Sequence, residues 1–273
     1  IGERRVIVSD LAPAATFISS NYNKTLSREN FKKEIEKIIS ELENELGFLY
    51  KTKHNESEFG DINYVIWSEQ YSCPNCLNEF DYWTTTYDQE NDKTLKTFNC
   101  PNCNSELTKL KSTKNWETVF DPISKTYEKI AKIRPININY TFKGKRFNKQ
   151  VDEYDLENIK KGLELLEKEE LEIFNIPDGV NTSQPKTSNG FKYLHQLYSA
   201  RTNIVISKYL EKIAKIKDRN LGMFILTASL QNMSYLYRWR ASGKGGILAG
   251  TYYVCSTPQE NNPFIQLKRK LKD

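Results

Sequence analysis

The sequence has no long hydrophobic run and no secretory signal. Its longest apolar stretches, such as 203–206 and 222–230, fall far short of the roughly 20 residues that a membrane-spanning helix needs. The first residues, Ile-Gly-Glu-Arg-Arg, contain neither a Met start nor the apolar stretch of a signal peptide. We therefore expect no membrane partner, and we interpret the chain as a fragment of a longer protein.

A strong excess of one charge is also missing, because 40 Lys and Arg residues face 35 Asp and Glu residues, a formal net charge of +5. Any affinity for nucleic acid must therefore come from local patches rather than from overall charge. The 273 residues, 38% hydrophobic and 27% charged, are typical of a soluble globular protein of one large or two ordinary domains.

Histidine is scarce, and the sequence predicts no catalytic residue. The two histidines, His54 and His195, have no carboxylate, Ser or Cys partner at a recognised motif spacing, so we interpret both as surface or packing residues. Cys255 stands alone on an apolar stretch and is typical of a small core residue.

The other four cysteines form two Cys-Pro-Asn-Cys units, Cys73 with Cys76 and Cys100 with Cys103. Two thiolates two residues apart can bind one metal ion, and tetrahedral zinc needs both units facing each other. The segment 77–99 is long enough for a β-hairpin that brings them together. The pattern predicts a structural zinc ribbon in a reducing cytosol, the alternative being a pair of turns without metal.

Hydrophobic periodicity predicts an α+β fold in which this small antiparallel β module is inserted among amphipathic helices. Helices are expected at 14–20, 31–46, 156–166, 199–216 and 218–239. Strands are expected at 5–9, 64–67, 82–87, 94–98, 136–142 and 251–255. The segment 175–189, rich in Pro, Gly, Ser, Thr and Asn, is the best linker candidate.

Asp10 follows the predicted strand 5–9. An acid in this position can accept hydrogen bonds from the hydroxyls of a cofactor ribose, or it can be an ordinary loop or cap residue.

Three segments, taken in order, resemble the site-specific DNA methyltransferases with the N4/N6-methylase type of catalytic domain, most of them adenine-specific. GERRVIVSDLAPAATFISSNYN at 2–23 resembles the segment after the family's cofactor-binding glycine loop. YLHQLYSAR at 193–201 resembles its His-x-Leu-Phe-Thr-x-Arg run, and GTYYV at 250–254 resembles its Gly-Thr-Leu-Tyr-Val strand. A zinc ribbon between such segments is common in these enzymes.

The resemblance implies that Asp10 holds the ribose of S-adenosylmethionine. It also implies that the chain begins with a scrap of a Rossmann-like methyltransferase domain. The expected organisation is then a cofactor-domain fragment at 1–25, a helical connector at 26–60, the zinc ribbon at 61–116, a β patch with helix and linker at 117–189, and a helical region ending in a strand at 190–273.

Two family motifs do not occur in the chain: the catalytic Asp-Pro-Pro-Tyr tetrapeptide and the Phe-x-Gly-x-Gly cofactor loop. In family order they would lie after residue 273 and before residue 1. We therefore expect the central recognition region of an enzyme that methylates an exocyclic amine, N6 of adenine first among them, and no activity from this chain alone.

The expected partner is double-stranded DNA, with restriction-system subunits as further candidates. A cluster of basic residues around the β module is suited to phosphate contacts, or it is an ordinary solvated face. Its members are Lys109, Lys111, Lys114, Arg134, Lys143, Lys145, Arg146 and Lys149, of which the last four are the predicted nucleic-acid-binding residues. The alternative function is a stand-alone zinc-ribbon module that binds nucleic acid or protein without enzymatic activity.

Overall fold

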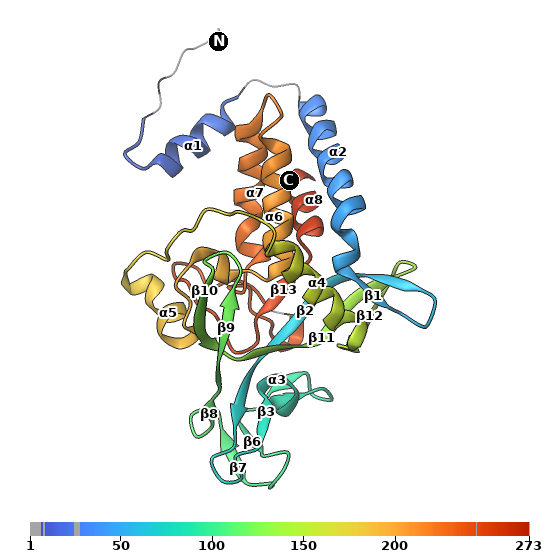
Figure 1. The fold of residues 1–273 in the computed structure, drawn as a ribbon, viewed down its shortest axis with the longest axis vertical. Helices are drawn as coiled ribbons and strands as arrows, with labels where there is room; N and C mark the ends of the chain where they lie inside the picture. The colour runs from blue at the N-terminus through green and yellow to red at the C-terminus, as the bar shows by residue number, and fades with distance from the viewer. Residues whose placement is uncertain (1–6, 8, 25–27, 244, 273) are drawn as a thin grey trace.

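A curled antiparallel sheet lies at the centre of the protein in the computed structural model, which describes residues 7, 9–24, 28–243 and 245–272 (Figure 1). Its longest strand is β2 (Phe59–Ser72), rich in the β-branched and aromatic residues that favour strands. The main path runs β1–β2–β11–β12, and three further strands pair with β2. The bounds are β1 (Lys51–Lys53), β11 (Ile133–Phe142), β12 (Lys145–Gln150), β3 (Glu79–Asp81), β8 (Thr113–Lys114) and β13 (Gln259–Asn261).

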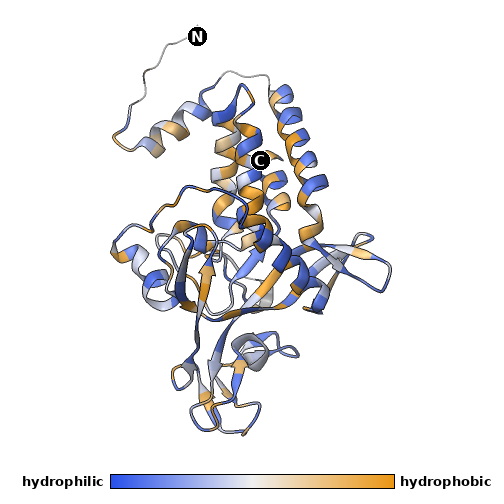
Figure 2. Cartoon of the chain, viewed as in Figure 1, coloured by the Kyte–Doolittle hydropathy of each residue, from blue (hydrophilic) through white to orange (hydrophobic). Residues whose placement is uncertain are grey.

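Helices cover one side of this sheet, above it in Figure 1. Side chains at helical spacing, such as Ile35, Ile39 and Leu42, are fully buried between them. Each such burial contributes roughly 1.5–3 kcal/mol, and Figure 2 shows the hydrophobic stretches along these helices. The bounds are α1 (Pro13–Tyr22), α2 (Arg28–Leu46), α4 (Glu153–Leu166), α5 (Ser183–Asn189), α6 (Ala200–Ile213), α7 (Arg219–Met233) and α8 (Pro263–Lys272).

Short elements connect these parts. The hairpin of β9 (Trp116–Asp121) and β10 (Thr126–Ala131) stands beside the sheet. Four 3₁₀ turns among the described residues are η1 (Gly47–Tyr50), η2 (Val180–Thr182), η3 (Leu194–Leu197) and η4 (Ala241–Gly243).

Residues 70–115 form a small lobe below the sheet in Figure 1, which we call the cysteine module. Its own core contains Tyr71, Phe80, Phe98 and Leu107 together with buried cysteines. Besides β3 and β8 it contains α3 (Tyr82–Thr86), β4 (Tyr87–Asp88), β5 (Lys93–Thr94), β6 (Thr97–Asn99) and β7 (Glu106–Thr108).

The cysteine module is joined to the main sheet because β2 runs continuously from one into the other. At the junction, Glu69 of β2 is 1% exposed and accepts hydrogen bonds from Lys114 and Tyr71 of the module. On another side of the junction, the ring of Trp239 lies 5.6 Å from that of Trp83 in α3, centroid to centroid. The module is therefore anchored by a buried ion pair and by aromatic packing.

The structure confirms the α+β class and most of the predicted helices. Helix α1 begins at Pro13, one residue before the predicted range, and α2, α4 and α6 overlap the ranges in which apolar residues recur at helical spacing. The predicted strand at 136–142 lies within β11. Local periodicity was sufficient for helices such as α2 and α6 because each buries one apolar face.

Three predicted elements are wrong. Residues 82–86 form α3 rather than a strand, because the Asp81 carboxylate accepts the backbone N–H of Thr84 and caps a helical turn. The helix predicted at 218–239 ends at Met233. Residues 251–255 form no strand. The strand that pairs with β2 in this part of the chain is β13, which the sequence patterns do not predict.

The remaining predictions concern the N-terminal strand, the linker and membrane-spanning helices. Most of the strand predicted at 5–9 lies outside the described residues, as does Ser27, whose residue type and position before the predicted helix 31–46 suit a helix cap. The linker candidate at 175–189 contains η2 and α5, and Pro185 and Asn189 of α5 are buried. No helix in the described part of the chain is long and apolar enough to cross a membrane.

Candidate metal centre

The two Cys-Pro-Asn-Cys units adopt the same backbone turn. In the first, the N–H of Leu77 donates to the Cys73 carbonyl, and Leu77 has a left-handed φ of 61°. In the second, the N–H of Asn104 donates to the Cys100 carbonyl, and the φ of Asn104 is 57°. Each turn links two antiparallel strands, the first joining the end of β2 to β3 and the second joining β6 to β7. The doubled motif is therefore a structural repeat.

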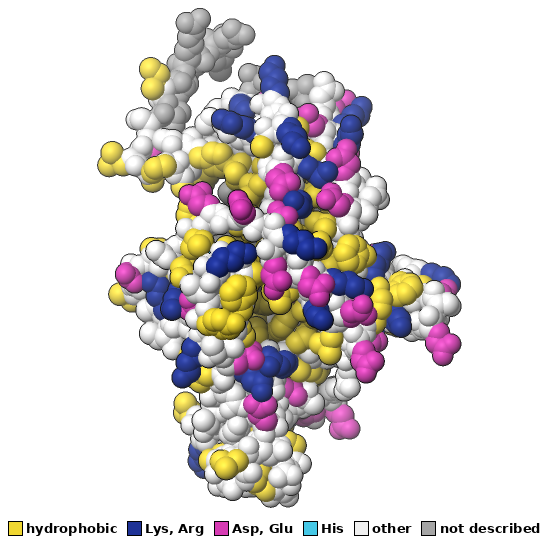
Figure 3. Space-filling view, viewed as in Figure 1, with side chains coloured by type: hydrophobic (Ala, Val, Ile, Leu, Met, Phe, Trp, Pro, Cys, Tyr) yellow, Lys and Arg dark blue, Asp and Glu magenta, His cyan; other side chains and the backbone are white. Residues whose placement is uncertain are grey.

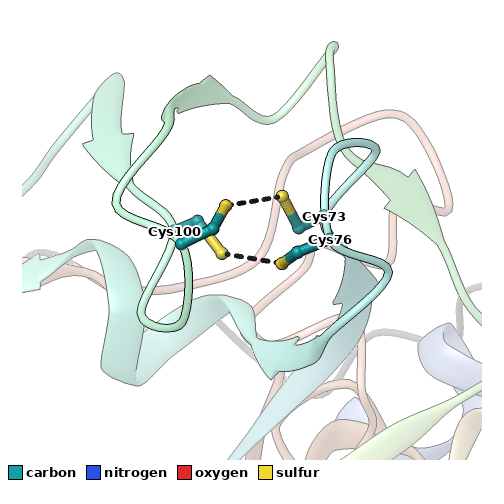
Figure 4. A group of neighbouring side chains, drawn as sticks. Cys73, Cys76 and Cys100 are labelled. Carbon is teal, nitrogen blue, oxygen red and sulfur yellow. Dashed lines mark hydrogen bonds between the residues drawn. The ribbon is translucent and has the colours of Figure 1, made fainter.

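The two turns face each other and bring all four cysteine Sγ atoms within 4.8 Å of one another. Sγ of Cys73 lies 3.7 Å from that of Cys103, and Sγ of Cys76 lies 3.6 Å from that of Cys100. Figure 4 shows the labelled side chains of Cys73, Cys76 and Cys100 pointing toward a common centre. Zn–S bonds of about 2.3 Å in a tetrahedron imply sulfur separations of about 3.8 Å. The four thiols therefore fit a metal ion such as zinc.

Two of the four thiols are set up for deprotonation. Burial raises the pKa of Cys73, but the backbone N–H groups of Cys76 and Asn75 outweigh it and lower that pKa to about 6. The hydroxyl and backbone N–H of Ser105 lower the pKa of Cys103 as well. Thiolates are the metal-binding form of cysteine, so these hydrogen bonds favour metal uptake. The exception is Cys100, where the backbone N–H of Cys103 lowers the pKa but burial and the neighbouring thiols outweigh it and raise that pKa to about 11.

Four cysteines close a tetrahedral coordination sphere and leave no position for water or substrate. Such a centre stabilises the fold around it and performs no chemistry. The fifth cysteine, Cys255, lies apart from the cluster, and burial raises the pKa of its thiol. Cys255 is half-buried, and its Sγ lies 4.0 Å from the hydroxyl oxygen of Thr257.

The predicted nucleic-acid-binding residues lie on the hairpin of β11 and β12 and on its turn. Lys145 and Arg146 are exposed and make no ion pair within the described residues. Lys143 pairs with Glu58 but remains largely exposed. Lys149 pairs with Asp152 and Asp155 of α4, so its charge is already balanced within the protein.

The other members of the basic cluster likewise divide into residues that form an ion pair and residues that do not. Lys109 and Lys114 pair with the buried Glu69, and Arg134 pairs with Glu117. Lys111 is exposed and has no ion pair in the part of the chain that the structure describes. The acidic partners of these basic residues are distant in the sequence, so no local sequence pattern could have predicted the ion pairs.

Asp10, the predicted cofactor ligand, is exposed just before α1. One of its carboxylate oxygens accepts the backbone N–H of Ala12 at 2.8 Å. No other side chain gathers around it among the described residues, so it forms no site with another predicted residue.

Sequence reasoning missed a partner of His195. Its Nε2 lies 2.7 Å from a carboxylate oxygen of Asp121, which comes 74 residues earlier and also accepts a hydrogen bond from Gln196. Burial raises the pKa of Asp121, but its hydrogen bonds with His195 and with backbone N–H groups outweigh it and lower the pKa to about 2. His54 stacks on Phe142, and its Nδ1 lies 2.9 Å from the hydroxyl of Tyr140, a partner that the sequence reasoning also missed.

A hydrophobic cavity of about 300 Å³ lies beside the Asp121–His195 pair, between the β9–β10 hairpin, α4 and the start of α6. Trp67, Phe120 and Leu163 are among its lining residues. Figure 3 shows hydrophobic side chains in a hollow near the middle of the viewed face. The Asp121 carboxylate orients the imidazole. Among the described residues, no Ser, Thr or Cys side chain forms a hydrogen bond with His195, and we propose no role for the pair in the chemistry.

In comparisons with known proteins, the chain matches no family model, no curated protein and no solved structure.

Proposed function

We propose that the cysteine module is a zinc ribbon, with one structural zinc ion bound by Cys73, Cys76, Cys100 and Cys103. The repeated turns, the sulfur separations and the lowered pKa of the Cys73 thiol support this assignment. The module's apolar core is small, and a lobe of this size commonly depends on a metal ion for its stability.

We further propose that the chain is the DNA-recognition part of an S-adenosylmethionine-dependent DNA methyltransferase of a restriction-modification or related system. The observation that carries this proposal is the exposed basic end of the β11–β12 hairpin, formed by Lys143, Lys145 and Arg146. Phosphate contacts of this kind position a protein on duplex DNA. The methylation step, adenine N6 as its target and Asp10 as a ribose ligand rest on the resemblance of the sequence.

A base must leave the DNA stack before its exocyclic amine can be methylated, and the enzyme must hold the duplex meanwhile. The basic end of the hairpin and the zinc ribbon lie toward opposite ends of β2, because Thr141 pairs with Asp61 near the start of this strand and Glu79 pairs with Ser72 at its end. The hairpin would hold the duplex, while the catalytic loop and the glycine loop would come from sequence outside these 273 residues.

The hairpin's role predicts a salt-dependent affinity for duplex DNA. Each phosphate contact releases counterions, so removing one should lower the slope of log K against log salt by about 0.9. The triple variant Lys143→Ala, Lys145→Ala, Arg146→Ala should therefore bind more weakly and with a flatter salt dependence, measured by fluorescence anisotropy. Its thermal unfolding should stay close to that of the wild type.

The matched control removes the same charge elsewhere, by replacing Lys32, Lys33 and Lys37 of α2, all exposed, with Ala. This control should keep the wild-type salt slope. If both triple variants behave alike, or if affinity does not change with salt, the hairpin is not the DNA-binding surface.

The missing loops predict that the chain alone transfers no methyl group to DNA. The assay is incorporation of radiolabelled methyl from S-adenosylmethionine into mixed-sequence duplex DNA. Incorporation above a no-protein background would show that a catalytic site exists within these 273 residues.

A further inference from the structure

The β11–β12 hairpin has one apolar face and one amide-rich face. Strand residues alternate between faces, and residues directly opposite each other share a face. The pairs Ile138 with Lys149 and Tyr140 with Phe147 point toward the core. The pairs Asn137 with Gln150, Asn139 with Asn148, and Thr141 with Arg146 therefore share the opposite face, which we call the amide face.

Hydrogen bonds hold part of the amide face in one arrangement. Nδ2 of Asn63 in β2 donates to Thr141 Oγ1 and to Asn139 Oδ1, both at 2.9 Å. Nδ2 of Asn139 then donates to Asn148 Oδ1 at 2.8 Å. Asn139 is buried, whereas Asn148 at the end of the chain of amides is exposed. The buried amides thus orient the Asn148 side chain before any ligand binds.

The exposed end of this chain keeps free hydrogen-bonding capacity. Nδ2 of Asn148 donates to no group within the described residues, and its Oδ1 retains a second lone pair. Gln150, two residues along on the same face, is exposed and makes no side-chain hydrogen bond within the same residues. Each amide therefore presents a donor and an acceptor side by side.

We propose that the amide face reads adenine in the major groove of duplex DNA, with Asn148 and Gln150 as the contacting side chains. Strand β12 is the end strand of the sheet path β1–β2–β11–β12, and strands of a β-sheet can read base edges in the major groove. The side chain of Asn or Gln can donate to adenine N7 and accept from its N6 amine at the same time. This inference rests on the proposed function, and it adds the kind of base that the chain recognises.

The charges around the hairpin agree with this placement. Arg146 lies on the amide face, and Lys143 and Lys145 lie at the turn, where they would meet phosphates as the hairpin enters the groove. The acid opposite Thr141 is Asp61, and its charge is balanced by an ion pair with Lys51. The amide face thus presents no unpaired acid among its described residues to repel DNA.

The experiment compares an adenine-containing duplex with the same duplex carrying 7-deazaadenine, which lacks the N7 acceptor. The wild-type chain should bind the modified duplex about fivefold more weakly, the effect of losing one or two hydrogen bonds. The variant Asn148→Ala, Gln150→Ala should bind both duplexes equally, while its salt dependence stays that of the wild type. Asn44→Ala, an exposed amide on α2, is the control and should keep the wild-type preference.

The outcomes separate the two proposals. Equal binding of both duplexes by the wild-type chain, or an unchanged preference in the Asn148→Ala, Gln150→Ala variant, would overturn adenine reading and leave salt-dependent DNA binding intact. Absence of duplex binding at any salt concentration would overturn both. A preference of the amide face for single-stranded nucleic acid or for a peptide would likewise refute the inference.

Discussion

Replacing Cys100 by Ser is expected to unfold the cysteine module and to leave the helical part of the protein folded. The variant removes one of four thiolates, and metal binding at such sites contributes about 10–16 kcal/mol of apparent folding free energy. The small core around Phe80 and Phe98 cannot replace that contribution. The helices pack in a separate and larger core, so they should survive.

The measurements are elemental analysis, circular dichroism and limited proteolysis. The wild type purified without chelator should contain one zinc per chain, and the variant should be cleaved within 70–115 while its helical signal remains. Cys255→Ser is the control, because this cysteine lies outside the cluster and should leave zinc content unchanged. Less than half an equivalent of metal in the wild type would contradict the assignment.

Replacing Glu260 by Gln is expected to destabilise the whole protein by about 3–5 kcal/mol, because it leaves the buried guanidinium of Arg201 without its counter-charge. Both side chains are at most 1% exposed, and Nη2 of Arg201 lies 2.9 Å from a Glu260 carboxylate oxygen. Tyr50, Trp67 and Ser199 also donate to this carboxylate. The pair and its hydrogen-bond partners join β13, α6 and β2, so its loss should destabilise the whole main core.

The carboxylate is ionised in the folded protein. Burial raises the pKa of Glu260, but the charge and hydrogen bonds of Arg201 outweigh it and keep the pKa below its ordinary value. Gln has nearly the same shape as Glu, so the variant removes the charge with little change in packing.

Urea unfolding followed by circular dichroism measures the effect. Lys160→Ala, which breaks an exposed ion pair with Glu164 on α4, should cost at most about 1 kcal/mol. The double variant Arg201→Met, Glu260→Leu should be less destabilised than Glu260→Gln, because it leaves no buried charge unpaired. A Glu260→Gln protein as stable as the wild type would show that the pair is dispensable.

The sequence by itself determined the features that depend on neighbouring residues. The turns at Cys73 and Cys100 form within a few residues, so the doubled motif predicted a metal site that four clustered sulfurs now support. Helices such as α2 were predictable because their apolar residues recur every three or four positions and bury one face. The α+β class followed from the same local patterns.

Only the tertiary structure decided which polar residues would be paired and which would remain free. Lys145 and Lys149 are equivalent in the sequence, yet Lys149 meets two acids of α4 while Lys145 stays exposed. Glu260 meets Arg201 59 residues away, and β13 pairs with β2 across almost 200 residues. Burial and ion pairing depend on which segments the fold brings together, and a local sequence pattern cannot predict those distant contacts.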